Sequence, residues 1–421
     1  MSTREADVVV VGGGIGGLAS AQALARLGLK VRLLEQSAEF GEVGAGLQIA
    51  PNCTRILDQW GLLEEVKSLG VLPENIVMKD ALDGAELTRL DLADVQARYG
   101  FPYMVIHRSD LHATFLRACQ RTGVELVNNV KVTAYEQVEG GARAISEGRA
   151  DEAEVVIAAD GIRSVARGYL VQDEPQSSAY VAYRGAVPIG DVMDNEVSLK
   201  DVVVYIGPRC HFVQYPLRQG EMFNQVAVFQ SPKALRGEED WGTPDELEGA
   251  FAHTVPQIRD ALKHMWRDKW WRMFDRLPIP NWVNGRVVLT GDSAHAPLQY
   301  LAQGAVMAIE DAWVLSEHIG RQGAEHIARQ GPTLGVAKGT PTGVDWDTAL
   351  KAFNDVRTEH TRRVLTTGRD WGELWHHDGE KRLWRNQVLR DRDIHDYSFV
   401  DWLYSRTAMT PDEEPPMFQK I

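Results

Sequence analysis

The residues with the clearest chemical meaning stand near the N-terminus, where Gly12, Gly14 and Gly17 give the spacing G-x-G-x-x-G. In a dinucleotide-binding turn the first glycine allows a tight turn, the second lets the backbone approach a pyrophosphate, and the third lets a helix pack on a strand. Glu35 ends the next apolar run, where a carboxylate can accept a hydrogen bond from a ribose hydroxyl. The pattern predicts a dinucleotide site and leaves NAD and FAD open. The alternative is a glycine-rich turn that holds no ligand.

The elements that must position these residues are a strand, a helix and a second strand. Residues 7–11 form a short β-branched run, typical of a strand buried on both faces of a parallel sheet. Residues 18–27 are rich in Ala and Leu and are followed by a glycine, which favours a helix, and residues 30–35 read as the next strand. Two later apolar runs of the same kind end in Asp and Gly: residues 155–159 and 286–290.

The middle of the chain has a different pattern. Apolar and polar residues partly alternate around glycine-containing turns, which predicts an antiparallel sheet, in residues 202–206, 211–217 and 223–229. Dinucleotide-type strands before and after this sheet indicate one discontinuous nucleotide domain interrupted by a substrate-binding domain. Residues 320–344 are rich in Gly, Thr and Pro and are predicted to be a mobile insertion or long surface loop, with helix resuming near Trp346.

Two further motifs carry a family resemblance. Residues 159–167 read Ala-Asp-Gly-Ile-Arg-Ser-Val-Ala-Arg around Asp160, and residues 289–297 read Leu-Thr-Gly-Asp-Ser-Ala-His-Ala-Pro around Asp292. With the glycine turn, they resemble the motifs of the single-component FAD-dependent aromatic hydroxylases, the flavoprotein monooxygenases of the para-hydroxybenzoate hydroxylase type. The resemblance extends to about Val364. It implies an α/β fold with a Rossmann-like FAD-binding domain, an inserted antiparallel-sheet substrate domain and a C-terminal helical segment.

The resemblance also implies roles for single residues of the cofactor site. Asp160 is expected near the dinucleotide, and Asp292 is expected to accept a hydrogen bond from a flavin ribityl hydroxyl. Arg108 matches the arginine that reaches the FAD pyrophosphate, and Gln48 is a candidate for the isoalloxazine environment. The structural alternatives are that the two aspartates only cap turns and that Arg108 forms a surface salt bridge.

After the second motif the sequence departs from the family, which usually continues with a proline and then Gly-Gln-Gly. Here Gln299 stands in the place of the proline and Ala302 replaces the first glycine, while Gly304 is kept. An amide side chain beside the flavin could hydrogen-bond a substrate phenol and help to fix its protonation state. The alternative is that Gln299 only caps the following helix.

Three more residues are candidates for the substrate site. Strand periodicity puts His211, Val213 and Tyr215 on one face, and in this family a comparable sheet covers the substrate. A histidine with its ordinary pKa near 6.5 could accept a phenol proton around neutral pH. Tyr103 could bind a carboxylate or phenol. The alternative for each is a core or surface position.

The implied activity is hydroxylation of a phenolic aromatic acid with NAD(P)H and dioxygen, through a flavin C4a-hydroperoxide. Within the family the sequence is most similar to the salicylate hydroxylases and the 3-hydroxybenzoate 6-hydroxylases. Oxidation of 3-hydroxybenzoate to gentisate with NADH is favoured, because His211 and Gln299 at the phenol would activate the para position. The alternatives are decarboxylating salicylate 1-hydroxylation, another aromatic or heteroaromatic acid, and a flavin oxidase or dehydrogenase that never hydroxylates.

The expected domains follow from the positions of these patterns. Residues 1–75, 100–176 and 276–365 are assigned to the FAD-binding domain and residues 76–99 and 177–275 to the substrate-binding domain. Residues 366–421 form the helical segment, in which a concentration of tryptophans suggests a homodimer. A hydrophobic dimer interface could also hold a lipid-like molecule.

Composition limits the remaining function classes. The chain has 421 residues, 44% hydrophobic and 25% charged, and a formal net charge of −14, which disfavours nucleic acid as a partner. Its three cysteines, Cys53, Cys119 and Cys210, have no paired spacing. No signal-peptide pattern or transmembrane run is apparent, and we expect a cytoplasmic protein. The histidines show no metal-binding spacing, so no metal is expected.

Overall fold

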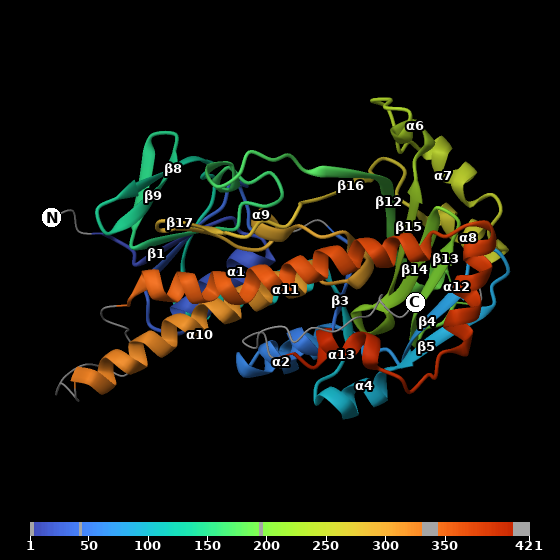
Figure 1. Ribbon diagram of the computed structural model, residues 1–421, viewed down its shortest axis with the longest axis horizontal. Coiled ribbons are helices and arrows are strands. Elements are labelled where there is room, and N and C mark those ends of the chain that lie inside the picture. The colour runs from blue at the N-terminus through green and yellow to red at the C-terminus, as the bar shows by residue number, and fades with distance from the viewer. Residues whose placement is uncertain (1–3, 42–43, 193–196, 331–343, 407–421) are drawn as a thin grey trace.

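The fold is built around two large sheets joined by long helices. The computed structural model describes residues 4–41, 44–192, 197–330 and 344–406 (Figure 1). A parallel sheet with helices packed on it, an antiparallel sheet and a C-terminal group of helices are all present. The α/β fold class expected from the sequence is confirmed.

The first sheet has six strands in the order β17-β18-β11-β1-β2-β7. Strand β1 pairs in parallel with β11 on one side and with β2 on the other. Both β1 and β11 are buried along their whole length, as their unbroken apolar runs predict. Only β17, at the edge, pairs antiparallel. The strands are β1 (Val8–Val11), β2 (Val31–Leu34), β7 (Glu125–Val127), β11 (Val155–Ala158), β17 (Val283–Asn284) and β18 (Val287–Leu289).

Two small sheets flank this one. An antiparallel three-stranded meander consists of β8 (Val132–Val138), β9 (Gly141–Ser146) and β10 (Arg149–Ala153). An antiparallel pair consists of β3 (Gly46–Ile49) and β6 (Met104–His107). The pair places Gln48 of β3 opposite Val105 of β6, the strand that leads into Arg108.

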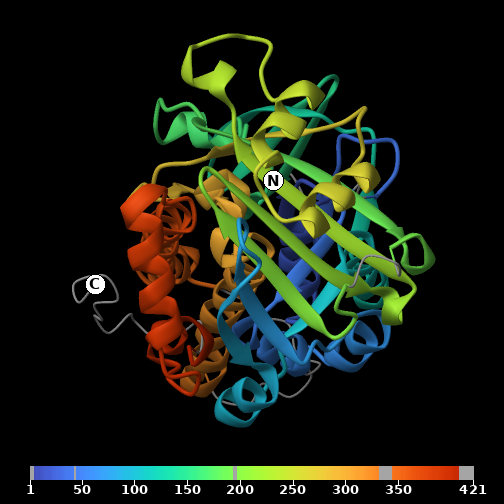
Figure 2. The ribbon, with the colours of Figure 1, turned by 90° about the vertical axis from the view of Figure 1, so that its right-hand side faces the viewer.

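The seven-stranded sheet is broad and forms the front of Figure 2, with strand order β16-β12-β15-β14-β13-β4-β5. Its strands pair antiparallel except β13 with β4, because the β4–β5 hairpin comes from an earlier part of the chain and joins at the edge. The strands are β4 (Asn75–Asp80), β5 (Glu86–Asp91), β12 (Gln176–Pro188), β13 (Asp201–Gly207), β14 (Cys210–Leu217), β15 (Met222–Gln230) and β16 (Trp271–Asp275).

The helices divide between these sheets. Those on the six-stranded sheet and its connections are α1 (Ile15–Ala25), α2 (Pro51–Gln59), α3 (Leu63–Leu69), α5 (Arg108–Thr122), α9 (Asp292–His295) and α10 (Gly304–Gln330). Those near the seven-stranded sheet are α4 (Leu92–Tyr99), α6 (Pro232–Leu235), α7 (Pro244–Phe251), α8 (Pro256–Ala261), α12 (Gly379–Asp391) and α13 (Ser398–Tyr404).

Helix α11 (Trp346–Trp375) connects the two regions. In Figure 1 it runs from beside the six-stranded sheet to the seven-stranded sheet, packed along α10. Helix resumes near Trp346 as predicted, but the expected boundary between residues 365 and 366 falls inside this continuous helix. The loop predicted from residue 320 is wrong for residues 320–330, which continue α10, because Arg, Gln, Ala and Glu predominate there and favour a helix despite two glycines. Residues 331–343 lie outside the described residues.

A buried ionic group fixes α10 to α11. The guanidinium of Arg357 donates to Asp311 and to Glu310, each at 2.8 Å, and all three side chains are fully buried. The Asp311 carboxylate also bonds His295 Nε2 at 2.5 Å. His295 is thereby tied into the buried ionic group that joins α10 to α11.

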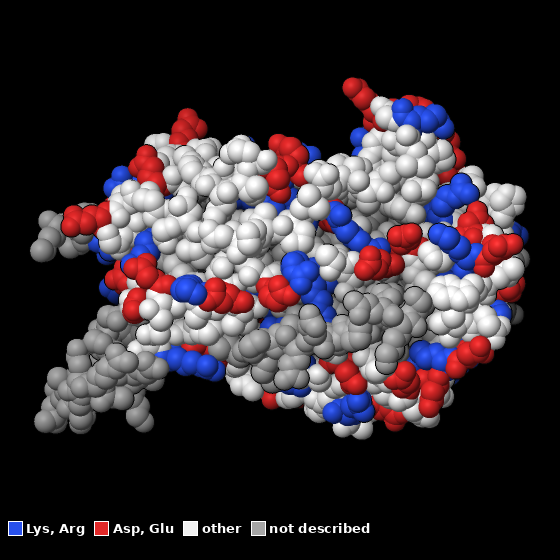
Figure 3. Space-filling model, viewed as in Figure 1, with Lys and Arg blue, Asp and Glu red and all other residues white. Residues whose placement is uncertain are grey.

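The outer surface carries charges of both signs. On the face shown in Figure 3, Lys and Arg side chains are interspersed with Asp and Glu. Within the described residues, no helix is long and apolar enough to cross a membrane.

Candidate active site

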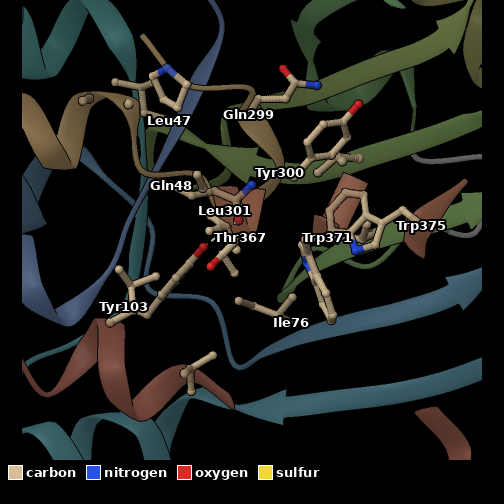
Figure 4. A pocket seen from close by; sticks show the side chains of 18 of the residues that line it. Leu47, Gln48, Ile76, Tyr103, Gln299, Tyr300, Leu301, Thr367, Trp371 and Trp375 are labelled. Atoms are coloured by element: carbon tan, nitrogen blue, oxygen red, sulfur yellow. Dashed lines mark hydrogen bonds between the residues drawn. The ribbon is translucent and has the colours of Figure 1, made fainter. Parts of the chain in front are cut away.

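One large cavity lies between the two sheets and contains most of the residues selected from the sequence. Its volume is about 830 Å³, and it reaches from the glycine turn to the C-terminal helices. Figure 4 shows Gln48 and Tyr103 on one side, Trp371 and Trp375 on the opposite side, and Gln299 above them. The cavity is more than large enough for a single aromatic acid, so it can take a cofactor and a substrate together.

The dinucleotide end of the cavity is formed by the start of α1. A Cβ atom on Gly17 would lie 1.9 Å from the carbonyl oxygen of Gly12, and Gly12 itself has a φ of +108°. These glycines allow the strand, turn and helix to pack as the motif predicts. Gly14 caps α1 without a side-chain hydrogen bond, so the first backbone N–H groups of the helix have no side-chain acceptor. Such a helix end binds phosphate.

Other predicted cofactor residues surround the same end. Gly304 lines the cavity at the first position of α10, and Arg108 lines it at the start of α5. Two helix N-termini and an arginine thus face one volume, which suits a pyrophosphate. The residues present therefore fit a bound FAD.

Glu35 organises the glycine turn in addition to any contact with a ribose. Its Oε2 accepts a hydrogen bond from the backbone N–H of Gly13 at 2.6 Å, and its Oε1 accepts one from Ser37 at 2.8 Å. Each carboxylate oxygen retains a lone pair that could accept from a hydroxyl.

We expect Glu35→Ala to release FAD, because the substitution removes both the ribose acceptor and the tie to Gly13. The flavin absorbance that elutes with the protein on gel filtration measures this loss, and we expect a decrease of at least about tenfold in affinity, or 1.4 kcal/mol. Glu39→Ala, an exposed carboxylate nearby, is the control. Full flavin retention in Glu35→Ala would contradict the assignment.

The two motif aspartates have different surroundings. Asp160 caps the turn that follows it: its Oδ2 accepts from the backbone N–H of Val165 at 3.0 Å and from the hydroxyl of Tyr135 at 3.1 Å. Neighbouring residues Ala159 and Gly161 line the cavity, but Asp160 itself does not. Asp292 is exposed and lines the cavity at the first position of α9, where its carboxylate can accept a hydrogen bond from a ligand. A direct role at the cofactor is thus better supported for Asp292.

Gln48 and Tyr103 form a bonded pair at the cavity wall. The Tyr103 hydroxyl donates to Gln48 Oε1 at 2.6 Å, between β3 and the segment that enters β6 (Figure 4). Tyr103 is buried, and burial raises its pKa well above the ordinary value, so the hydroxyl keeps its proton. The pair presents polar atoms where the expected FAD site meets the expected substrate site.

The predicted face of β14 points into the cavity. His211, Val213 and Tyr215 all line it, while Phe212 belongs to the core on the other side of the sheet. A Cβ on Gly46 would lie 2.4 Å from the Tyr215 ring, so the tyrosine packs directly on the backbone of β3. Alternation along the strand was sufficient to find this face.

Gln299 lies next to His211 at the cavity wall. The two Nε2 atoms lie 3.3 Å apart, and Gln299 begins a short 3₁₀ turn, Gln299–Leu301, that ends in left-handed Ala302. Burial lowers the pKa of His211 to about 3, so its imidazole is neutral at physiological pH. The pair offers one neutral imidazole and one amide to a polar group of a substrate.

Several site residues were not selected from the sequence. His376 directly follows α11 and lies 2.9 Å from His211, and the Tyr300 and Trp375 rings pack around the same histidine. Arg184 lines the cavity and places its guanidinium over Trp271. No local sequence pattern links these residues to the site, because they lie far apart in the chain.

Comparisons with known proteins agree with this geometry. A family model described as an FAD binding domain matches residues 5–327. The chain is 36% identical to the 3-hydroxybenzoate 6-hydroxylase of Polaromonas naphthalenivorans strain CJ2, over 96% of this chain and 97% of that one. The chain belongs to the FAD-binding family of flavoprotein monooxygenases and is an FAD-dependent aromatic hydroxylase.

Solved structures support the fold. A Klebsiella pneumoniae HpxO variant complexed with FAD has a TM-score of 0.78 and 21% identity, covering 96% of this chain and 99% of that chain. A salicylate hydroxylase substrate complex has a TM-score of 0.73 and 24% identity, covering 97% of each chain. These likenesses extend beyond residue 327 and include the C-terminal helices.

Proposed function

We propose that the protein hydroxylates 3-hydroxybenzoate to gentisate, using NADH and dioxygen. The observation that carries the proposal is the His211–Gln299 pair, placed in a largely apolar cavity that also contains the FAD-type glycine turn. The relative that shares 36% identity is named for the same reaction, which supports the choice of substrate.

The bound flavin supplies electron transfer from NADH and activation of dioxygen, and the protein supplies binding, orientation and exclusion of water. Gly12, Gly14, Gly17 and Glu35 hold the dinucleotide, with Arg108 and Asp292 as further polar contacts. Apolar and aromatic walls exclude water, which protects a reactive oxygen species from unproductive breakdown.

The proposed catalytic task of His211 is to accept the phenol proton at Nε2. A phenolate makes the ring electron-rich at its para carbon, where hydroxylation gives gentisate. Gln299 donates to the phenol oxygen and stabilises the negative charge. Tyr215 keeps its proton, because burial raises the pKa of its hydroxyl, and it serves as a donor to the substrate. Tyr103 also keeps its proton but donates it to Gln48, so its oxygen can accept a hydrogen bond from the substrate. Arg184 lies near Tyr215 and adds positive charge for an anionic ligand.

The first experiment is oxidation of NADH, and separately of NADPH, by the yellow holoprotein with a panel of hydroxybenzoates. Products are identified by chromatography. Gentisate from 3-hydroxybenzoate, with one NADH consumed per product, is the expected result. Catechol from salicylate would replace the proposal with decarboxylating 1-hydroxylation. NADH oxidation that yields only hydrogen peroxide with every acid would overturn the hydroxylase activity proposed for this site.

We also propose that the protein is a homodimer that pairs through α12. Leu383, Trp384 and Val388 on this helix are 62%, 46% and 36% exposed, an unusual apolar stripe for a solvent-facing helix. Trp384 and Val388 also line the outer end of the cavity. A lipid-like molecule at the interface could therefore extend an apolar chain into this end.

We expect Leu383→Glu combined with Val388→Glu to convert the dimer into monomers, because two buried carboxylates per protomer would oppose association. Light scattering after gel filtration measures the mass. Leu235→Glu, at a residue equally exposed on α6, is the control and should leave the mass unchanged. Native mass spectrometry of the unaltered protein that finds only unliganded monomer would exclude both the dimer and the lipid.

A further inference from the structure

We propose that His376 is a positioning and proton-relay residue, which takes the phenol proton from His211 and passes it toward solvent. The proposal rests on the proposed function, in which His211 is the first acceptor. His376 does not line the cavity and therefore acts through His211 rather than on the substrate.

The geometry is that of a direct chain of ring nitrogens. His211 Nδ1 and His376 Nε2 lie 2.9 Å apart, and the two rings are nearly parallel, with an interplanar angle of 24°. On the opposite edge of the first ring, Nε2 faces the cavity beside Gln299. The exposed fraction is 1% for His211 and 8% for His376. The path thus leads from the substrate cavity outward.

The short distance fixes the hydrogen positions of both rings. Two neutral imidazole nitrogens at 2.9 Å need one N–H between them, since two lone pairs would repel. If His211 Nε2 is to accept from a phenol, its hydrogen must be on Nδ1, and Nδ1 then donates to His376 Nε2. The hydrogen of His376 is consequently on Nδ1. His376 thereby holds His211 in the tautomer that the reaction needs.

The proton transfer balances along this chain. The phenol O–H breaks and an N–H forms at His211 Nε2. The N–H at His211 Nδ1 breaks and one forms at His376 Nε2. The proton on His376 Nδ1 then leaves to water. The products are a bound phenolate, two neutral imidazoles with exchanged tautomers, and a solvated proton.

The surroundings explain why transfer onward is needed. Burial opposes a positive charge on either ring and lowers the pKa of both. His211, Arg385 and His377 also disfavour a cation at His376. Tyr180 stacks on His376 at 4.5 Å, with the Tyr300 and Trp375 rings close to the pair. A lone buried histidine would hold the proton poorly, whereas a two-histidine chain passes it on.

The test compares His376→Gln with His376→Phe in the oxidised holoenzyme. A glutamine amide can still hydrogen-bond His211 Nδ1 but cannot relay a proton, whereas phenylalanine does neither. The holoenzyme is mixed with 3-hydroxy-4-nitrobenzoate, whose phenolate absorbs visible light, and phenolate formation is followed by stopped flow between pH 6 and 9. His253→Gln, at an exposed histidine outside the cavity, is the control.

We expect both variants to form phenolate at least about tenfold more slowly than the unaltered protein, with KM for 3-hydroxybenzoate within about threefold and kcat decreased. A normal rate in both variants, or in His376→Gln alone, would overturn the relay and leave at most a packing role.

The two proposals fail in distinguishable ways. If 3-hydroxybenzoate gives no gentisate but phenolate formation slows in the variants as expected, the substrate assignment is wrong and the relay stands. If gentisate forms and the variants are as fast as the unaltered protein, only the relay is wrong. A holoenzyme that binds no phenolic probe would contradict both proposals, because each assumes that the cavity binds a phenol beside His211.

Discussion

His211→Ser should decrease hydroxylation by about 100-fold or more while the protein keeps its FAD. The size of the effect follows from the usual contribution of a positioned general base. Serine is too short to reach the phenol from β14, and it also leaves His376 without its partner at 2.9 Å. The measurements are kcat for product formation and the phenolate absorbance of the bound substrate.

His253→Ser, at an exposed histidine outside the cavity, is the control for the loss of an imidazole. The flavin content of each variant, read from its absorbance, separates a catalytic effect from a loss of cofactor. A His211→Ser variant with unchanged phenolate titration and turnover would exclude the role of general base.

Gly17→Ala should abolish stable FAD binding and lower the stability of the fold by about 3 kcal/mol, at the upper end of the range for overpacking. The added Cβ would lie 1.9 Å from the Gly12 carbonyl oxygen and 3.0 Å from its carbonyl carbon. Both neighbours are backbone atoms within the turn, so neither can rotate away. The helix must move off the strand, and the phosphate-binding end of α1 moves with it.

Flavin content and a thermal melt measure the two parts of this prediction. Gly168→Ala is a suitable control, because a Cβ there would meet nothing within 4 Å and the residue has no positive φ. A Gly17→Ala protein with a full complement of FAD and an unchanged melting temperature would show that α1 does not pack as described.

The parts of the fold that could be predicted are those specified by short stretches of sequence. The strand, glycine turn and helix over residues 8–25 are local, and their apolar run and glycine spacing permit only one arrangement. The cavity-facing side of β14 followed from a period of two, which a single strand displays by itself. Gln299 was found because it interrupts a familiar motif.

The rest depended on contacts between distant segments. His376 is 165 positions from His211, and nothing in its own neighbourhood marks it as a site residue. The tryptophans of the C-terminal segment were interpreted as an interface, but Trp371, Trp375, Trp384 and Trp402 all line the cavity, and only the partly exposed Trp384 also fits a dimer surface. Residues 320–330 were misassigned because the Gly, Thr and Pro residues that predict a loop are concentrated after residue 330.

The continuity of α11 has a consequence for how the molecule unfolds. Its 30 residues span about 45 Å, and along this length the helix carries both Arg357, which joins the buried ionic group beside α10, and Gly372, which packs on Tyr300. The six-stranded and seven-stranded sheets cannot separate unless α11 breaks or the buried ion pairs of Arg357 with α10 are lost. Heating should therefore melt both sheets in one cooperative transition, and flavin release should coincide with the loss of antiparallel structure rather than precede it.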